Sequence, residues 1–205
     1  MRSVFDKQAE RYDEWFDDNE FTYLTELEAL KKLVPASGKG LEVGVGTGRF
    51  ALPLNISVGI DPSFEMLRIA KRRGIRVVAG EGENLPSGGE KFDYVLLMIT
   101  LCFVKNPQKV IRESKRVIKN GGEIVVGIID KNGLLGKFYQ EKDSPFYKIA
   151  KFYTAKECIK LLEKNRFKNI TTYQTIFSSP QVINGIDVIK QGYGEGSFVV
   201  ISGEK

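Results

Sequence analysis

The chain contains no histidine and only two cysteines, Cys102 and Cys158, among its 205 residues. Two isolated thiols make neither a disulfide framework nor a zinc site, so we expect no bound metal. This cysteine usage is typical of a reducing compartment, and we expect a cytoplasmic location. Because histidine is absent, any general base must be a carboxylate, a tyrosine, a lysine or solvent.

Long apolar segments are also missing. The most apolar run, residues 94–104, is far shorter than the roughly 20 residues that span a bilayer. The first twenty residues are charged throughout, so we expect no signal peptide and no membrane partner. The chain has no internal repeat, and its length and 42% hydrophobic content are typical of one globular domain.

Charge is unevenly distributed along the chain. Residues 1–30 contain nine acids and three bases, a net charge of −6, which leaves +11 on the rest of a chain whose total is +5. A basic body could meet an anionic partner. The bases are scattered along predicted helices without a binding motif, so the pattern favours a solvated surface over a nucleic-acid partner.

Apolar patterning predicts alternating strands and helices from residue 41 onward. The expected strands are residues 41–45, 58–61, 76–79, 94–98 and 123–129. The clearest helices between them are 63–73, for which Ser63 is a candidate N-cap, and 108–118. Near-continuous apolar strands that alternate with helices indicate a parallel sheet covered on both faces. Ligands of such sheets bind at the carboxyl ends of the strands.

The two ends of the chain differ from this pattern. Two helices are expected before Pro35, and a helix at 154–165 is expected to be capped by Thr154. Strands at 170–173 and 197–202 have no helix between them and are predicted to pair antiparallel through a long loop. The predicted class is therefore α/β: one domain with a doubly wound, mostly parallel seven-stranded sheet, an antiparallel last strand and an N-terminal helical cap.

The strongest chemical signal is Glu42-Val43-Gly44-Val45-Gly46-Thr47-Gly48, which follows the first strand and is expected to open a helix. Glycines permit a sharp turn and close approach of a ligand to the backbone. Free N–H groups of the helix would favour a carboxylate or phosphate. A dinucleotide fingerprint would place its third glycine at position 49, which is arginine here. A tight turn without a ligand is the structural alternative.

This glycine spacing, with an acid two residues before the first glycine, resembles that of the class I S-adenosylmethionine-dependent methyltransferases. Four further segments extend the resemblance in the same order: Asp61 at the end of the second strand, and residues 80–86, 92–98 and 119–122. The N-terminal residues 9–16 also look like a family feature. The resemblance covers about residues 5–130 and more loosely 150–205. It implies S-adenosylmethionine as methyl donor, and a small molecule is the favoured acceptor.

The resemblance implies a set of residues that bind the methyl donor. They are Tyr12, Glu42, Gly44, Val45, Gly46, Gly48, Asp61, Pro62, Met66, Glu81, Gly82, Glu83 and Met98. Asp61 would accept both ribose hydroxyls, or would merely cap the next helix. Glu81 and Gly82 would meet the adenine, although the family more often has Asp and Ala there. Tyr12 would contact the carboxylate of the methyl donor, or would belong to an apolar stripe.

Two departures from the family pattern concern the spacing after the glycines and the turn before the fifth strand. Asp61 lies only 13 residues after Gly48, whereas about 20 is usual, so the first crossover must be short. Asn120 replaces the usual proline of the turn before the fifth strand. The Asn/Asp-Pro-Pro-Tyr/Phe sequence of enzymes that methylate adenine or glutamine amino groups is missing, which disfavours those acceptors.

The acceptor side is predicted to lie in residues 131–153, which follow the fifth strand at the same rim. We expect Tyr139, Phe146 and Tyr147 to contact the acceptor, or alternatively only to pack this segment down. The predicted parts are thus a cap (1–35), a methyl-donor core (36–130), an acceptor-side lid (131–153) and a C-terminal helix and hairpin (154–205). The sequence identifies no general base, no atom that is methylated and no oligomeric state.

Two other function classes remain open at this point. A non-catalytic module could keep the fold and bind S-adenosylmethionine without transferring its methyl group. A nicotinamide-dependent oxidoreductase could share the fold, but the position of the third glycine, Gly48, disfavours it.

Overall fold

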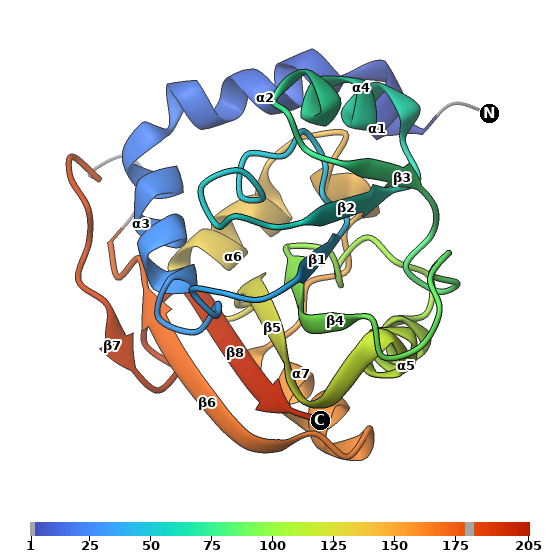
Figure 1. The fold of residues 1–205 in the computed structure, drawn as a ribbon. Coiled ribbons are helices and arrows are strands. Elements are labelled where there is room, and N and C mark those ends of the chain that lie inside the picture. The colour runs from blue at the N-terminus through green and yellow to red at the C-terminus, as the bar shows by residue number, and fades with distance from the viewer. Residues whose placement is uncertain (1–2, 179–182) are drawn as a thin grey trace.

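The computed structural model describes residues 3–178 and 183–205, which form one mixed sheet with helices on both faces (Figure 1). The strand order is β3-β2-β1-β4-β5-β8-β6-β7. Pairing is parallel from β3 through β5 and antiparallel on both sides of β8. The strands are β1 (Gly40–Val43), β2 (Val58–Asp61), β3 (Val77–Ala79), β4 (Phe92–Met98), β5 (Ile118–Ile129), β6 (Lys168–Thr175), β7 (Lys190–Gln191) and β8 (Phe198–Glu204).

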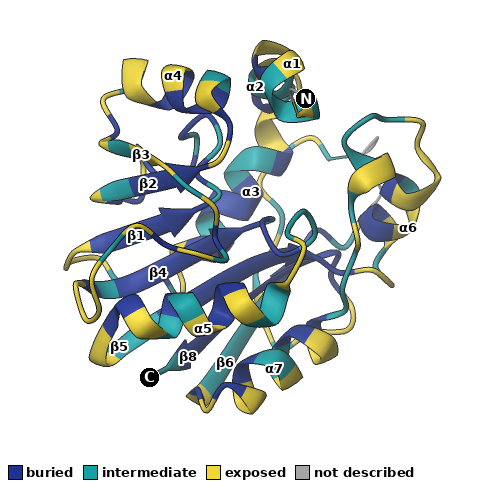
Figure 2. Ribbon diagram, turned by 90° about the vertical axis from the view of Figure 1, so that its right-hand side faces the viewer, coloured by how far each residue is buried: buried dark blue, intermediate teal, exposed yellow. Residues whose placement is uncertain are grey.

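The helices divide between the two faces of the sheet. Helices α5 and α7 pack on one face, and α3 and α4 pack on the other, with a hydrophobic cluster in each layer (Figure 2). Helices α1 and α2 lead into α3 above the carboxyl ends of the strands. The helices are α1 (Val4–Lys7), α2 (Ala9–Asp18), α3 (Glu20–Leu30), α4 (Phe64–Arg72), α5 (Pro107–Val117), α6 (Leu134–Glu141), the 3₁₀ turn η1 (Tyr147–Ile149) and α7 (Ala155–Lys164).

The predicted fold class is confirmed, and so are two predicted helix caps. The Ser63 hydroxyl accepts from the Met66 amide at 3.3 Å, and Thr154 forms a reciprocal capping box with Glu157. The antiparallel pairing of the last two long strands is also confirmed. An eighth strand, β7, lies in the segment that was expected to be loop. It has only two residues, which is too short for a hydrophobic pattern to predict a strand.

The expectation that the glycine loop opens a helix was wrong. Residues 44–57 between β1 and β2 form successive turns, with isolated helical hydrogen bonds such as that from the Leu52 amide to the Gly48 carbonyl at 3.3 Å. Three glycines with positive φ and Pro53 leave too few residues for a regular helix. This segment still covers the sheet, because Phe50, Leu54 and Ile56 are buried.

Two other boundaries differ from the sequence prediction. The first expected helix is interrupted at Gln8, which separates α1 from α2. Residues 119–122, expected as a turn, belong to β5, which begins directly after α5 with a register shift opposite Phe92 and Tyr94. Within the part of the chain that the structure describes, no helix is both long and apolar enough to cross a membrane.

Candidate functional site

Two adjoining cavities open where β1, β2 and β4 end. The first, which we call the rim cavity, has a volume of about 460 Å³ and extends along the ends of β1 to β3. The second, the lid cavity, has a volume of about 180 Å³ and lies between α2, α3 and residues 139–147. Both are lined by Tyr12, Gly44, Met98, Ile99 and Phe103.

The two cavities gather nearly all of the residues predicted from the sequence. The rim cavity is lined by ten of the thirteen methyl-donor candidates, namely Tyr12, Gly44, Gly46, Asp61, Pro62, Met66, Glu81, Gly82, Glu83 and Met98. Two further methyl-donor candidates, Glu42 and Val45, line the lid cavity. All three acceptor candidates, Tyr139, Phe146 and Tyr147, line it as well. Gly48 lines neither cavity, so a contact with the methyl donor is not supported there.

The three glycines of the turn after β1 are required for different physical reasons. All have positive φ. A Cβ at Gly44 would lie 2.5 Å from the Thr100 hydroxyl, and one at Gly48 would lie 3.2 Å from Ala70 and Ile75, so both positions are constrained by protein packing. At Gly46, a Cβ would have only Tyr12 within 4 Å, at 3.7 Å. Gly46 therefore keeps the rim cavity open, as a ligand that approaches the backbone requires.

Asp61, the last residue of β2, is buried and fixes the floor of the rim cavity. One carboxylate oxygen accepts from the Gly46 amide at 3.0 Å, and the other accepts from the Ser63 amide at 2.8 Å. Burial raises the pKa of this carboxyl, and the two amides oppose the rise. Each oxygen retains a lone pair, so the side chain can also accept from the hydroxyls of a bound ribose.

The loop after β3 contributes residues of two kinds. Glu81 is exposed and free to turn toward a ligand at the edge of the rim cavity. The Glu83 carboxylate instead accepts from the backbone amides of Lys105 and Asn106 at 2.9 and 3.2 Å. Glu83 thus ties the loop after β3 to the start of α5, which favours a structural role over a direct ligand contact.

Ile99 lies at the junction of the two cavities in a strained conformation. It follows β4 directly and has a φ of 49°. A β-branched residue rarely adopts this region, and such strain concentrates at functional sites. The Ile99 amide donates to the Gly127 carbonyl at 2.8 Å, which holds the strained turn in place.

An aromatic cluster covers the same junction. Tyr12 of α2 meets Phe146 of the lid edge-on, with ring centroids 5.7 Å apart. Phe5 of α1 contacts both Phe146 and Phe103, at 5.4 and 5.0 Å. The cap helices and the lid therefore touch above the place where the cavities meet, and they shield it from water.

Ion pairs fasten α2 to the glycine-rich turn. Arg49 pairs with Asp13 at 3.0 Å and with Asp17 at 2.7 Å, and Arg73 also pairs with Asp13 at 2.6 Å. The hydrogen bonds from these arginines lower the pKa of Asp13 against the opposing effect of its burial. These ion pairs explain why the acidic helix α2 packs against the turn that follows β1.

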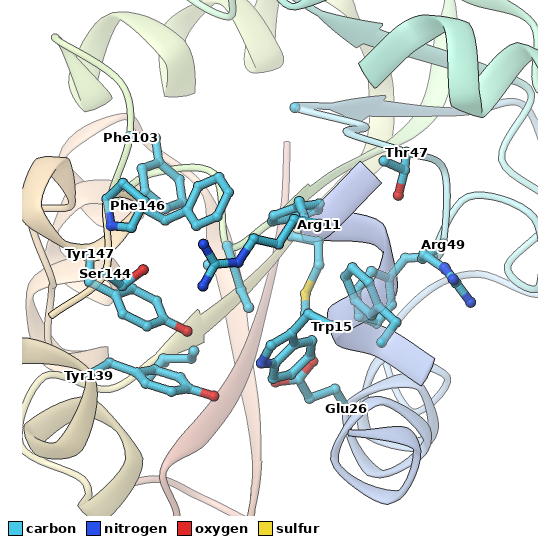
Figure 3. A pocket seen from close by; sticks show the side chains of 18 of the residues that line it. Arg11, Trp15, Glu26, Thr47, Arg49, Phe103, Tyr139, Ser144, Phe146 and Tyr147 are labelled. Atoms are coloured by element: carbon cyan, nitrogen blue, oxygen red, sulfur yellow. The ribbon is translucent and has the colours of Figure 1, made fainter. Parts of the chain in front are cut away.

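Aromatic rings form a large part of the wall of the lid cavity (Figure 3). Tyr139 of α6 and Tyr147 of η1 stack with centroids 4.3 Å apart and planes inclined by 20°. Their hydroxyls point across the cavity toward Trp15 and Glu26. Burial raises the pKa of both tyrosines, so they remain protonated.

Two buried carboxyls line this cavity, and the sequence reasoning found only one of them. Glu42 of β1 is 2% exposed, and Glu26 of α3 is 1% exposed. Both Glu26 oxygens and one Glu42 oxygen have no hydrogen-bond partner among the residues that the structure describes. Burial raises the pKa of Glu26 to about 8, and burial together with the nearby Asp61 raises that of Glu42. The sequence carried no clear signal for Glu26, because α3 lacks a distinct apolar face and a glutamate within a helix is usually solvated.

Together, the sheet order, the glycine-rich turn and the acid at the end of β2 define a nucleoside-binding α/β fold with a second, enclosed cavity beside the nucleoside site. A methyltransferase-domain family model matches residues 41–126. An uncharacterized protein of Methanocaldococcus jannaschii is 54% identical over 99% of both chains. Another, from Mycobacterium tuberculosis, is 35% identical over 98% of this chain and 73% of its own length.

A solved structure from Thermotoga maritima is similar over almost the whole chain. It is described as a methyltransferase that depends on S-adenosylmethionine and as a possible histamine N-methyltransferase. It is 44% identical, covers 98% of both chains and superposes with a TM-score of 0.95. The present chain therefore belongs to the class I S-adenosylmethionine-dependent methyltransferases: it is an enzyme of this family and binds S-adenosylmethionine.

Proposed function

We propose that the protein transfers the methyl group of S-adenosylmethionine to a small molecule held in the lid cavity. The observation that carries this proposal is the common wall of the two cavities, where Tyr12, Gly44, Met98, Ile99 and Phe103 face both. A methyl group presented from the rim cavity at this wall can meet an acceptor atom from the other side. The lid cavity, at about 180 Å³, has room for a small molecule and not for a folded macromolecule.

The methyl-donor residues fit this arrangement. The open space at Gly46 and the remaining lone pairs of Asp61 suit a nucleoside in the rim cavity. Tyr12 lines the junction, where the methionine part of the methyl donor would end, and Glu42 and Val45 line the lid cavity beside it. The unpartnered Glu42 oxygen is suited to its amino group.

Methyl transfer requires mainly that the acceptor is correctly positioned and that water is excluded from the site. S-adenosylmethionine supplies a methyl group that is already activated by its sulfonium, so the protein need only align the acceptor and exclude water. The aromatic rings of Tyr12, Phe103 and Phe146 exclude water from the junction. The strained turn at Ile99 holds the common wall at one position.

Binding and turnover measurements test the proposal. Calorimetry should find that S-adenosylmethionine and S-adenosylhomocysteine bind, and that NAD binds poorly. The protein should then be incubated with S-adenosylmethionine and small amines, phenols, carboxylates or RNA, and products identified by mass spectrometry. Histamine belongs in the first set because of the description of the Thermotoga maritima structure. Methylated RNA without any methylated small molecule would contradict the proposal, and binding without any product would favour a non-catalytic module.

A further inference from the structure

The Glu26 side chain is a buried carboxyl that has no hydrogen-bond partner for either oxygen among the described residues. It projects from α3 into the lid cavity and is 1% exposed. Removing a carboxylate from water without a partner costs several kcal/mol. Burial raises the pKa of Glu26 to about 8, so the ligand-free site keeps the carboxyl protonated near neutral pH, and a cationic ligand would supply the partner that lets it ionise.

The surroundings of Glu26 indicate the charge of that ligand. The nearby titratable groups are the hydroxyls of Tyr12, Tyr139 and Tyr147, whose pKa values the Glu26 charge raises. The basic residues that line the cavity are Arg11, Arg49 and Lys142. Arg11 and Lys142 are exposed, and Arg49 already pairs with two aspartates. The cavity thus encloses a carboxyl that can ionise beside a cation, while Arg49 is already paired and the exposed Arg11 extends its guanidinium across the cavity (Figure 3).

The walls of the cavity suit a cation with an apolar body. Trp15, Phe16, Tyr139 and Tyr147 line the same cavity as the Glu26 carboxyl, and the hydroxyls of the two tyrosines point toward Trp15 and Glu26 (Figure 3). Aromatic rings attract cations through the negative potential of their faces, and they also pack against a planar ring. An anionic acceptor would lie beside the buried Glu26 carboxyl, and none of the basic residues that line the cavity is itself buried.

We propose that the acceptor is a small arylalkylamine whose nitrogen contacts the Glu26 carboxyl, with the aryl group between the aromatic rings of the lid cavity. This inference rests on the proposed function and names the substrate class for the same site. A neutral phenol is the weaker candidate, because it cannot form a charge-assisted hydrogen bond with the Glu26 carboxyl as an ammonium can.

The proton balance of the reaction follows from the same contact. The bound ammonium passes one proton to a Glu26 oxygen, which frees the nitrogen lone pair. The new nitrogen–carbon bond forms as the carbon–sulfur bond breaks, and that electron pair goes to sulfur, which becomes neutral. The product is an N-methylammonium, and Glu26 releases its proton to solvent when the product leaves. The raised pKa of Glu26, about 8, suits a carboxyl that must accept this proton.

The test compares three ligands of similar size: phenethylamine, 4-ethylphenol and phenylacetate. Each is titrated by calorimetry into protein saturated with S-adenosylhomocysteine, and each is incubated with S-adenosylmethionine for mass spectrometry. The same titrations use Glu26→Gln, which keeps the shape and removes the charge. Glu28→Gln is the matched control, because Glu28 lies on the same helix in an exposed pair with Lys31.

We expect phenethylamine to bind the unmodified protein at least tenfold more tightly than the phenol or the acid. Glu26→Gln should remove this preference, since a charge-assisted bond is lost, while Glu28→Gln should retain it. Affinity for S-adenosylhomocysteine should stay within threefold in both variants, which also verifies that they fold. The comparison of ligands in the unmodified protein does not depend on any variant.

The inference is overturned if the phenol or the acid binds as well as the amine, if Glu26→Gln keeps the preference, or if the amine fails to bind the loaded protein. Methylation of 4-ethylphenol or phenylacetate, with the amine ignored, would reject the amine and keep the proposed small-molecule function. Failure of every small molecule in the broader screen, with RNA methylated instead, would reject the proposed function itself.

Discussion

At the residue scale, the glycine-rich turn shows that one motif can contain positions with unrelated purposes. Gly44 and Gly48 are constrained by Thr100 and by the residues of α4 and the following turn, whereas Gly46 faces the rim cavity. In the sequence the three glycines look equivalent, because their spacing does not show whether each one faces protein atoms or open space. Asp61 is similar: its position predicted a ligand contact, but its bonds to the Gly46 and Ser63 amides appear only in three dimensions.

We expect Gly46→Val to block binding of the methyl donor. The side chain would enter the rim cavity next to Tyr12, and the positive φ of 53° adds strain of about 1–2 kcal/mol. Affinity for S-adenosylhomocysteine, measured by calorimetry, should fall at least tenfold.

Gly74→Val provides the control for strain. Gly74 has a φ of 88°, and a Cβ there would have no atom within 4 Å. This variant should lose comparable stability in thermal unfolding and retain normal affinity. If both variants lose affinity equally, strain and not steric blockage explains the effect, and Gly46 has no special part in binding.

At the scale of elements, local signals predicted every strand except β7, and also α5 and the caps of α4 and α7, because each is decided by neighbouring residues. For the acceptor-side lid, the sequence predicted only the range of residues, 131–153, and no helix within it. Its Tyr139 and Tyr147 belong to α6 and η1 and stack on each other, an arrangement that depends on how two short elements fold back. Which of its aromatic rings face a cavity could not be known from composition.

Single alanine substitutions of Tyr139, Phe146 and Tyr147 should affect the acceptor more than the methyl donor. All three line the lid cavity and none lines the rim cavity. We expect affinity for S-adenosylhomocysteine to change less than about threefold, or ~0.7 kcal/mol. Turnover of an identified acceptor should fall at least tenfold for one or more of them.

The matched control is Phe138→Ala, since Phe138 also lies on α6 and lines neither cavity. Its turnover should stay within a few-fold of the unmodified protein once its folded fraction is equal. Full turnover in all three test variants would place the acceptor elsewhere, as would a collapse of methyl-donor binding.

At the scale of the whole molecule, the fold was predictable because alternating strands and helices have few topological solutions. The lid cavity was harder to predict than the fold. Its wall comes from α2, α3, the turn after β1 and the lid, which are far apart in sequence. Glu26 illustrates the limit: a glutamate within a helix is usually solvated, and only the packing of α3 on the sheet buries it.

The burial of Glu26 should make global stability depend on pH. Its pKa in the folded protein, about 8, exceeds the ordinary value of 4.5. Its contribution is therefore fully present below about pH 4.5 and is lost as the pH rises through 8. Relative to Glu26→Gln, the ligand-free protein should lose up to about 5 kcal/mol of unfolding free energy between pH 4.5 and pH 9.

Denaturant unfolding at a series of pH values measures this difference, and Glu28→Gln should follow the unmodified protein throughout. Parallel curves for Glu26→Gln and the unmodified protein would mean that Glu26 has an ordinary pKa and is hydrated in solution.

The common wall of the two cavities has a thermodynamic consequence. A ligand that orders Tyr12, Met98 and Ile99 from one side changes the surface met by a ligand on the other side. If filling the rim cavity strengthens acceptor binding by some factor, the acceptor must strengthen methyl-donor binding by the same factor. In the proposed arrangement the demethylated product would occupy the same rim cavity, so it too would retain the acceptor. Such reciprocity would make S-adenosylhomocysteine an inhibitor that traps the second substrate on the enzyme.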